Sequence, residues 1–304
     1  MTGRARAFVA LLWLLGVCGI ARAQDMEPRA YANAPIGLNF LLAGYAYTRG
    51  GASFDPALPV TDPDLETSSL VLGYGHVFDL WGQSAKLNVV VPYTFLSGHA
   101  HFAGRPMERE VSGFATPIVK LSVNLHGAPA LSLKDYASYR QDLIIGASLR
   151  VGAPWGQYDD TKAVNLASNR WSFKPEIGVS KALGRWIVEG AAGVTFYTDN
   201  KDYFNGNTRS QDPVYSAEGH AIYSFNRGVW GSLDLTYFTG GRTTVNGVVN
   251  HDLQQNWRLG GTLSMPLGVQ DSIKLYASSG VSARTGNNYD LLGIAWQHRW
   301  GGGL

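Results

Sequence analysis

Residues 186–196 read WIVEGAAGVTF, and this stretch decides the class of fold. Its even-numbered positions carry Trp, Val, Gly, Ala, Val and Phe, whereas its odd-numbered positions include Glu189 and Thr195. Alternation of this kind over ten or more residues is typical of a transmembrane β-strand, with one face toward lipid and the other toward a barrel interior. Strands of soluble folds average only about five or six residues. The stretch therefore predicts a strand that crosses a membrane.

Eleven further segments have the same length and alternation. The twelve predicted strands are 36–48, 66–78, 84–97, 110–124, 141–153, 170–181, 185–197, 213–225, 229–240, 254–266, 271–284 and 288–300. Long polar connections alternate with tight turns, as in bacterial outer-membrane barrels, so we predict an all-β fold with a single antiparallel barrel. Two connections depart from the pattern: 285–287 is short for an external loop, and 125–140 is long for a periplasmic one. In the latter, Ser132 is expected to cap a helical turn at the barrel mouth. A soluble β-sandwich or propeller is the alternative, disfavoured by the strand length.

The composition excludes other classes of protein. Charged residues make up 16% of the chain, against about 25% in a typical soluble protein, and 37 of the 304 residues are Gly. A mean hydropathy of −0.08 argues against a bundle of membrane-spanning helices, which would need runs of about 20 apolar residues. An aromatic content of 12% argues against disorder.

The N-terminus has the features of a secretory signal peptide. Arg4 and Arg6 precede the apolar stretch 7–21, and Ala21-Arg22-Ala23 forms an A-x-A cleavage site. We therefore predict a signal peptide over residues 1–23 and a barrel domain over 24–304; a lipoprotein signal using Cys18 is the alternative. Cleavage removes three Arg and no acidic residue, so the net charge changes from +2 to −1. This balance argues against a nucleic-acid partner.

Three parts of the chain resemble a known family. They are Arg150–Asn200, Ile36–Thr48 and Leu87–Gly98, and the most specific stretches within them read GQYD from Gly156 and NRWSFKPE from Asn169. They are similar to the meta-pathway phenol-degradation family of outer-membrane transporters. The resemblance implies a barrel that passes hydrophobic or aromatic compounds into the cell, and it supplies no catalytic residues.

Charged side chains on the polar strand faces are the candidate pore-lining residues. A Lys or Arg on the lipid face costs about 2–4 kcal/mol near the membrane midplane, so these residues are expected to point into the lumen. They are Lys86, Lys120, Arg150, Lys174, Glu176, Glu189, Glu218, His220, Asp234, Arg258 and Lys274. Two interpretations stay open: a charge-separated constriction that orients a solute, or a salt-bridge network that fills a narrow barrel.

Three tyrosines are candidate contacts for an aromatic solute. Tyr45, Tyr47 and Tyr276 fall on the predicted inner face, where they would offer stacking surfaces or simply fill the lumen.

The sequence indicates neither an enzyme nor a cofactor. No G-x-S-x-G motif is present. A lipid hydrolase of this fold would need Ser and His together on the outer face, and the only histidines on predicted lipid faces, His76 and His298, both lie near the periplasmic ends. His99 and His101 have the spacing of a metal-binding pair but no evident third ligand, so no metal site is predicted.

The sequence thus predicts a porin-like barrel in the bacterial outer membrane that passively admits small hydrophobic or aromatic compounds. The alternative function is a structural or adhesive barrel with a filled lumen and no transport. The expected partners are outer-membrane lipids and lipopolysaccharide, the barrel-assembly machinery during biogenesis, and the solutes themselves.

Overall fold

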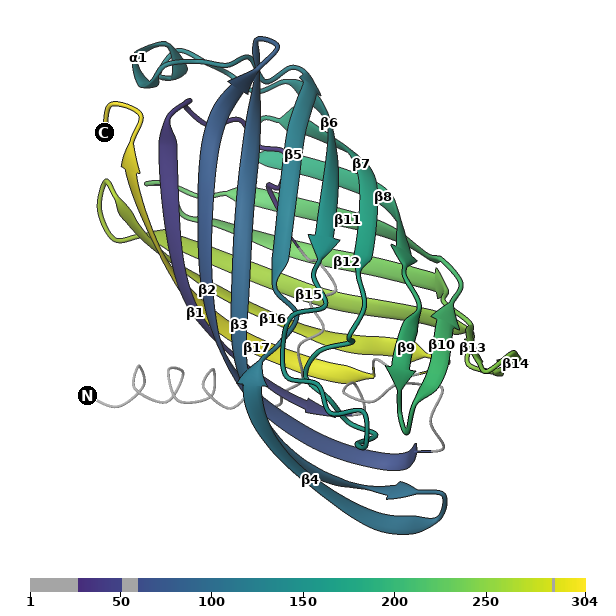
Figure 1. The fold of residues 1–304 in the computed structure, drawn as a ribbon. Coiled ribbons are helices and arrows are strands. Elements are labelled where there is room, and N and C mark those ends of the chain that lie inside the picture. Colours follow the sequence, from purple (N-terminus) through teal and green to yellow (C-terminus); the bar gives the residue numbers. More distant parts are fainter. Residues whose placement is uncertain (1–26, 51–59, 286–287) are drawn as a thin grey trace, which may run out of the picture.

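The fold is a closed barrel of antiparallel strands (Figure 1). A computed structural model describes residues 27–50, 60–285 and 288–304. The predicted signal peptide lies outside these residues. Strands account for 68% of the chain and helix for 2%. Among the described residues, no helix is long and apolar enough to cross a membrane.

Twelve strands form the wall, as predicted. They are β1 (Leu38–Gly50), β2 (Val60–Leu80), β3 (Gln83–Phe102), β4 (Arg105–Phe114) continued by β5 (Ile118–His126), β6 (Leu143–Gly152), β7 (Ser172–Leu183), β8 (Trp186–Tyr197), β11 (Val214–Ser224), β12 (Trp230–Gly240), β15 (Gln254–Pro266), β16 (Asp271–Ala283) and β17 (Tyr289–Gly301). Both β4 and β5 pair with β3, so together they count as one strand. The barrel closes where β1 pairs with β17, from Leu38 opposite Gly301 to Gly50 opposite Tyr289.

The two ends of the barrel differ. At the short-turn end, which is uppermost in Figure 1, tight turns join the strands, and the C-terminus lies beside the helical turn α1 (Leu133–Tyr136). The predicted cap is confirmed, because Ser132 accepts a hydrogen bond from the backbone N–H of Asp135. At the opposite, loop end, parts of the long connections form a second small sheet. Its strands are β9 (Asn200–Tyr203), β10 (Asn207–Gln211), β13 (Thr243–Val245) and β14 (Val248–Val249).

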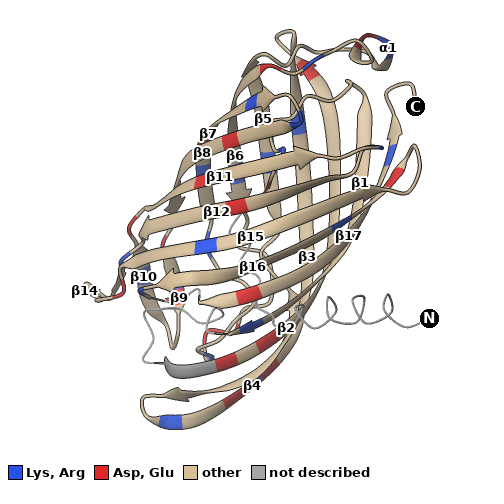
Figure 2. Cartoon of the chain, turned by 180° about the vertical axis from the view of Figure 1, so that it is seen from behind, with Lys and Arg blue, Asp and Glu red and all other residues tan. Residues whose placement is uncertain are grey.

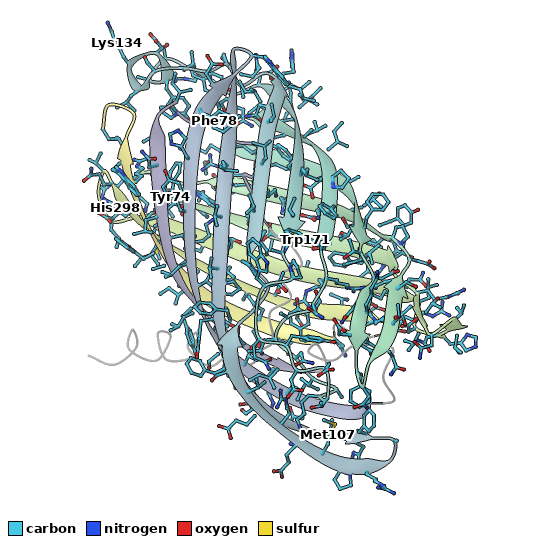
Figure 3. The ribbon with its side chains drawn as sticks, viewed as in Figure 1. Tyr74, Phe78, Met107, Lys134, Trp171 and His298 are labelled. Carbon is cyan, nitrogen blue, oxygen red and sulfur yellow. The ribbon has the colours of Figure 1, made fainter. Side chains whose placement is uncertain are left out.

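Two of the predicted external connections are shorter than expected. Between the predicted strands 36–48 and 66–78, β2 already begins at Val60. The segment 98–109 was expected to be an external connection, but β3 and β4 continue through it and turn only at Ala103-Gly104, so they extend well past the barrel (Figure 1). Met107 lies on this extension (Figure 3). Outside the membrane a strand needs no apolar face, so the alternation that marks spanning strands does not mark its end. Strand pairing is also interrupted at residues 115–117, where the connection after β6 packs: Gln157 N–H donates to the Phe114 carbonyl at 2.7 Å.

The outer surface is apolar and the interior is polar, the reverse of a soluble protein. Leu70, Leu72 and Leu233 are 53%, 61% and 69% exposed on the outside, whereas Thr236 and Asp234 are buried on the inside. Near the short-turn end, the rings of Tyr74 and Trp300 lie 6.2 Å apart, as in the aromatic girdle of a membrane barrel (Figure 3 labels Tyr74). The closed barrel and its apolar outer belt point to an outer-membrane protein.

Candidate functional site: the occluded lumen

Residues 27–37, which precede β1, enter the lumen from the short-turn end. At the entrance, Ile36 N–H donates to the Leu131 carbonyl at 2.9 Å, and Gly37 N–H donates to the Val77 carbonyl at 2.8 Å. Slightly deeper, the Tyr136 hydroxyl donates to the carbonyl of Asn33 at 3.0 Å. We call residues 27–37 the N-terminal segment. These contacts tie its outer part to the turns that surround the barrel mouth.

A lysine of β3 holds the backbone of this segment. The ammonium group of Lys86 donates to the carbonyls of Ala32, at 2.6 Å, and Ala30, at 3.2 Å. Hydrogen bonds from a charged donor are stronger than those between neutral groups. Because the contact is to backbone, it depends on the path of the segment rather than on its side chains.

An ion-pair chain runs from the segment into the barrel wall. Glu27 accepts a hydrogen bond from the ammonium group of Lys120 at 2.9 Å, and Lys120 lies 3.9 Å from Glu176. Lys174 continues the chain, at 2.8 Å from both Glu176 and Glu218. The charge of Lys120 holds the pKa of the Glu27 carboxyl at about 2, which keeps this carboxylate ionised. Figure 2 shows the basic and acidic positions on these neighbouring strands.

Arg29 contacts β8 and β12, which lie further around the same wall. Its backbone N–H donates to Oε2 of Glu189 at 2.7 Å, and the other carboxylate oxygen accepts from Ser180 at 2.8 Å. Its guanidinium lies 5.3 Å from the centre of the Trp230 ring, a cation–π arrangement.

Tyr31 fills a slot in the wall. Gly146 of β6 and Gly178 of β7 lie directly opposite each other in the sheet, and the tyrosine ring covers both. A Cβ added at Gly178 would come within 2.8 Å of the ring Cζ, and one at Gly146 within 2.8 Å of Cε1. The hydroxyl donates to Glu176 at 2.9 Å and lies 3.4 Å from Ser148. The side chain is 3% exposed, so the slot encloses it.

Further along the wall, two groups form separate contacts. His220 Nδ1 lies 2.8 Å from Asp234, whose other oxygen accepts from Ser232 at 3.0 Å. The Arg258 guanidinium donates to the Tyr289 carbonyl at 3.0 Å and lies 3.6 Å from the centre of that ring.

The structure places the predicted pore-lining residues on one continuous inner surface. Arg150 stands in register between Lys120 and Lys174, and Lys274 lies 5.8 Å from the Trp230 ring. The other nine make the contacts given above. These ion pairs are the arrangement expected of a salt-bridge network; the role of the residues in permeation stays a prediction.

Two of the three predicted aromatic contacts are on the wrong face. Tyr45 pairs across the sheet with Leu70 and Ile294, which are both exposed on the outside, and is itself 41% exposed. Tyr47 follows the same outward face. The prediction failed because β1 is apolar on both faces, so alternation does not fix which one points inward. Tyr276 does point inward, where its ring lies over Gly293 of β17.

The inner faces of β17, β1 and β2 carry mainly apolar and small residues between Phe40 and Ala46, with the polar residues Gln297, Arg299, Ser69, Thr48 and Thr67 at their edges. Register places Phe40, Gly75 and Asn88 in one row with Lys120, which fixes this face as the inner one. We call this surface the apolar arc; its residues are Phe40, Leu42, Gly44, Ala46, Val71, Gly73, Gly75 and Ala295. The inner faces of β5–β8, β11, β12 and β15 form the charged arc, with Lys120, Lys174, Glu176, Glu189, Glu218, His220, Asp234 and Arg258.

Sequence reasoning missed the N-terminal segment altogether. It has no periodicity, and its partners are distant in sequence: Arg29 and Glu189 are 160 residues apart. The one available signal was a pair of charged residues, Glu27 and Arg29, between the predicted cleavage site and the first strand.

A twelve-stranded barrel with an apolar outer belt and an occluded lumen defines the class of the protein, an outer-membrane barrel. The model of the family described as "Putative MetA-pathway of phenol degradation" matches residues 46–297, so the chain belongs to that family and the predicted resemblance is confirmed.

Solved structures show the same fold. The COG4313 outer membrane channel from Pseudomonas putida F1 is 20% identical, with a TM-score of 0.76 over 91% of this chain and 100% of that one. The β domain of the Bordetella autotransporter BrkA is 12% identical, with a TM-score of 0.52 over 87% of this chain and 100% of that one. A comparison with curated protein sequences gives no match.

Proposed function

We propose that this protein is a bacterial outer-membrane channel for the passive entry of small hydrophobic or aromatic compounds, and that the N-terminal segment gates it. The observation that carries the proposal is the apolar arc. A barrel wall that only had to hold a polar plug would gain nothing from phenylalanine, leucine and valine on its inner face, whereas an apolar solute needs such a surface. Membership of a phenol-degradation family and the likeness to the Pseudomonas outer membrane channel support the same proposal.

The polar contacts of the N-terminal segment suit a gate. Ion pairs and hydrogen bonds inside the lumen can be exchanged for bonds to water when the segment leaves, so release does not strand buried charges. In this proposal the short-turn end faces the periplasm, lipid and lipopolysaccharide surround the outer belt, and the barrel carries out no chemistry.

Two neighbouring leucines provide a matched test. Leu42 lies on the apolar arc beside Gly73, whereas Leu41 is 39% exposed on the outer face beside Tyr74. Intact cells that produce the protein should take up radiolabelled naphthalene faster than cells with an empty vector. Leu42→Gln should lower that rate several-fold, because it replaces the apolar side chain between Gly73 and Gln297 with a second amide, and Leu41→Gln should leave it unchanged. Equal uptake with and without the protein would overturn the proposal.

The ion-paired lumen favours a second candidate, a structural or adhesive barrel that stays filled. Single-channel recording of the refolded protein separates the two, because a permanently filled barrel gives no opening events. Heat-modifiable migration on a gel confirms that each variant is folded.

A further inference from the structure

The slot that holds Tyr31 has the features of a site for a free phenol. Its floor is a pair of glycines on adjacent strands, Gly146 and Gly178, which stand opposite each other in register. The absence of both side chains leaves a flat surface, and a ring is the natural shape to cover it. The inward positions on either side of this pair carry side chains, Ile144 opposite Ser180 and Ser148 opposite Glu176.

One edge of the slot recognises a hydroxyl group. Glu176 accepts the Tyr31 O–H at 2.9 Å, and Lys174, at 2.8 Å, and Lys120, at 3.9 Å, keep this carboxylate charged and in position. A charged acceptor discriminates strongly for a hydroxyl donor, because a ring that lacks one would leave the carboxylate short of a partner. Ser148, at 3.4 Å from the hydroxyl, stands beside it.

We propose that this slot is a binding site for free phenols, which enter it in exchange for Tyr31 and thereby release the N-terminal segment from the lumen. The inference rests on the proposed channel function and deepens it, since it names a solute class, a site and a trigger for opening. The side chain of Tyr31 is itself a para-substituted phenol, so it occupies the slot in the way that a free phenol would.

Exchange is feasible because Tyr31 is tethered. A tethered group competes with a free one at an effective concentration on the order of millimolar. Free phenols should therefore displace Tyr31 in the millimolar range, and they should bind much more tightly once Tyr31 has been removed.

The first experiment measures binding of p-cresol, the free equivalent of the tyrosine side chain. Tyr31→Ala empties the slot, and the refolded variant in detergent should bind one equivalent of p-cresol in equilibrium dialysis. Tyr31→Ala/Gly178→Val fills the slot again and should bind at least tenfold more weakly. Because both variants sit in the same micelles, partitioning of p-cresol into detergent cancels. Gly146→Val replaces Gly178→Val if that variant does not fold.

Toluene tests the hydroxyl edge. It has the shape of p-cresol without the hydroxyl donor. Tyr31→Ala should therefore bind toluene at least about tenfold more weakly than p-cresol. Equal binding of p-cresol by the open and filled variants, no binding by either, or equal affinity for toluene and p-cresol would each overturn the proposal.

The second experiment follows release in the wild-type protein. Trypsin can cut after Arg29 only when the segment has left the lumen, so millimolar p-cresol should accelerate that cut in the wild type. In Tyr31→Ala there is no ring to displace, and p-cresol should have no effect on the rate. An unchanged rate in the wild type would contradict the exchange.

Naphthalene uptake without p-cresol binding would support the channel function and contradict the phenol site. Specific p-cresol binding in a barrel that transports nothing would support the phenol site and contradict the channel function.

Discussion

The charged arc and the apolar arc face each other across one lumen, yet they differ in what they contact. The charged arc binds the N-terminal segment, and the apolar arc presents a surface for apolar compounds. Within the described part of the chain, the side chains that hold residues 27–32 come from β3, β5, β6, β7, β8 and β12, mainly the charged arc. On the apolar arc, small residues pack tightly around the larger ones: a Cβ added at Gly73 would lie 3.4 Å from the Cβ of Leu42.

The difference shows how one barrel can be both filled and permeable. A lumen uniformly lined with charge would hold a polar plug but repel an apolar solute, and a uniformly apolar lumen would have no means of fixing a polar peptide. With the two surfaces separated, the segment can be held along one side while the other side keeps its affinity for apolar compounds.

The largest effect is expected where the charged arc is most buried. Glu176 is 8% exposed, and it forms ion pairs with Lys174 and Lys120 and accepts a hydrogen bond from Tyr31. Glu176→Gln leaves two buried lysines without their shared carboxylate, so the free energy of unfolding should fall by about 3 kcal/mol. The midpoint of urea unfolding of the refolded barrel measures it.

The control for this change is an ion pair on the outside of the barrel. Glu66 lies 3.5 Å from Arg49, with their side chains 42% and 50% exposed. Glu66→Gln should cost less than about 1 kcal/mol, because water screens the pair. If both variants lose equally little stability, the charged arc is as wet as the outer surface, and the contrast with the apolar arc disappears.

The sequence predicted the wall of the barrel well because lipid imposes a rule on it. Spanning strands such as β8 and β12 must present apolar residues outward, so their bounds came within one or two residues of 186–197 and 230–240. The rule says nothing about strands outside the membrane, hence the error over 98–109. It is also silent where both faces are apolar, hence the misplaced Tyr45.

The occupant of the lumen could not be predicted for a different reason. Contacts such as Tyr31 to Glu176 join residues 145 apart in the chain, and only the closed barrel brings them together. Gly146 and Gly178 look ordinary in the sequence. They form one slot only because the strand register places them opposite each other, and the sequence of a single strand does not specify that register.

A moderate effect is expected from loosening the segment without disturbing the wall. Lys86→Met keeps the length of the side chain but removes its hydrogen bonds to Ala30 and Ala32. Hydrogen bonds from a charged group contribute roughly 1.5–3 kcal/mol. The ratio of released to docked segment should therefore rise about 10- to 100-fold, and trypsin cleavage after Arg29 should accelerate in proportion.

Lys181→Met is the matched control, because Lys181 pairs with Asp142 on the exposed surface at the short-turn end. It should leave cleavage after Arg29 unchanged. If Lys86→Met also leaves the rate unchanged while the barrel stays folded, the hydrogen bonds from Lys86 do not hold the segment.

The smallest effect concerns the first link of the ion-pair chain, between Glu27 of the N-terminal segment and Lys120 of the wall. Lys120 holds the pKa of Glu27 at about 2 in the docked state, against an ordinary value of 4.5 once the segment is released. The released segment therefore takes up a proton more readily, so acid favours release. The contribution of the pair is fully present above pH 4.5 and is lost as the pH falls toward 2. Because the Glu27 side chain is 52% exposed, its effect should be smaller than that of Lys86.

Single-channel open probability of the wild type and Glu27→Gln, compared from pH 8 to pH 2.5, tests this link. The wild type should open less often than the variant by a constant factor above pH 4.5, and the two should converge below it, because protonation of Glu27 reproduces the neutral glutamine. Glu108→Gln, on the exposed extension of β4, should follow the wild type throughout. Curves for the wild type and Glu27→Gln that coincide at every pH would mean that the docked segment gains nothing from Lys120. The segment would then be held in the lumen by Lys86, Glu189 and the slot that encloses Tyr31.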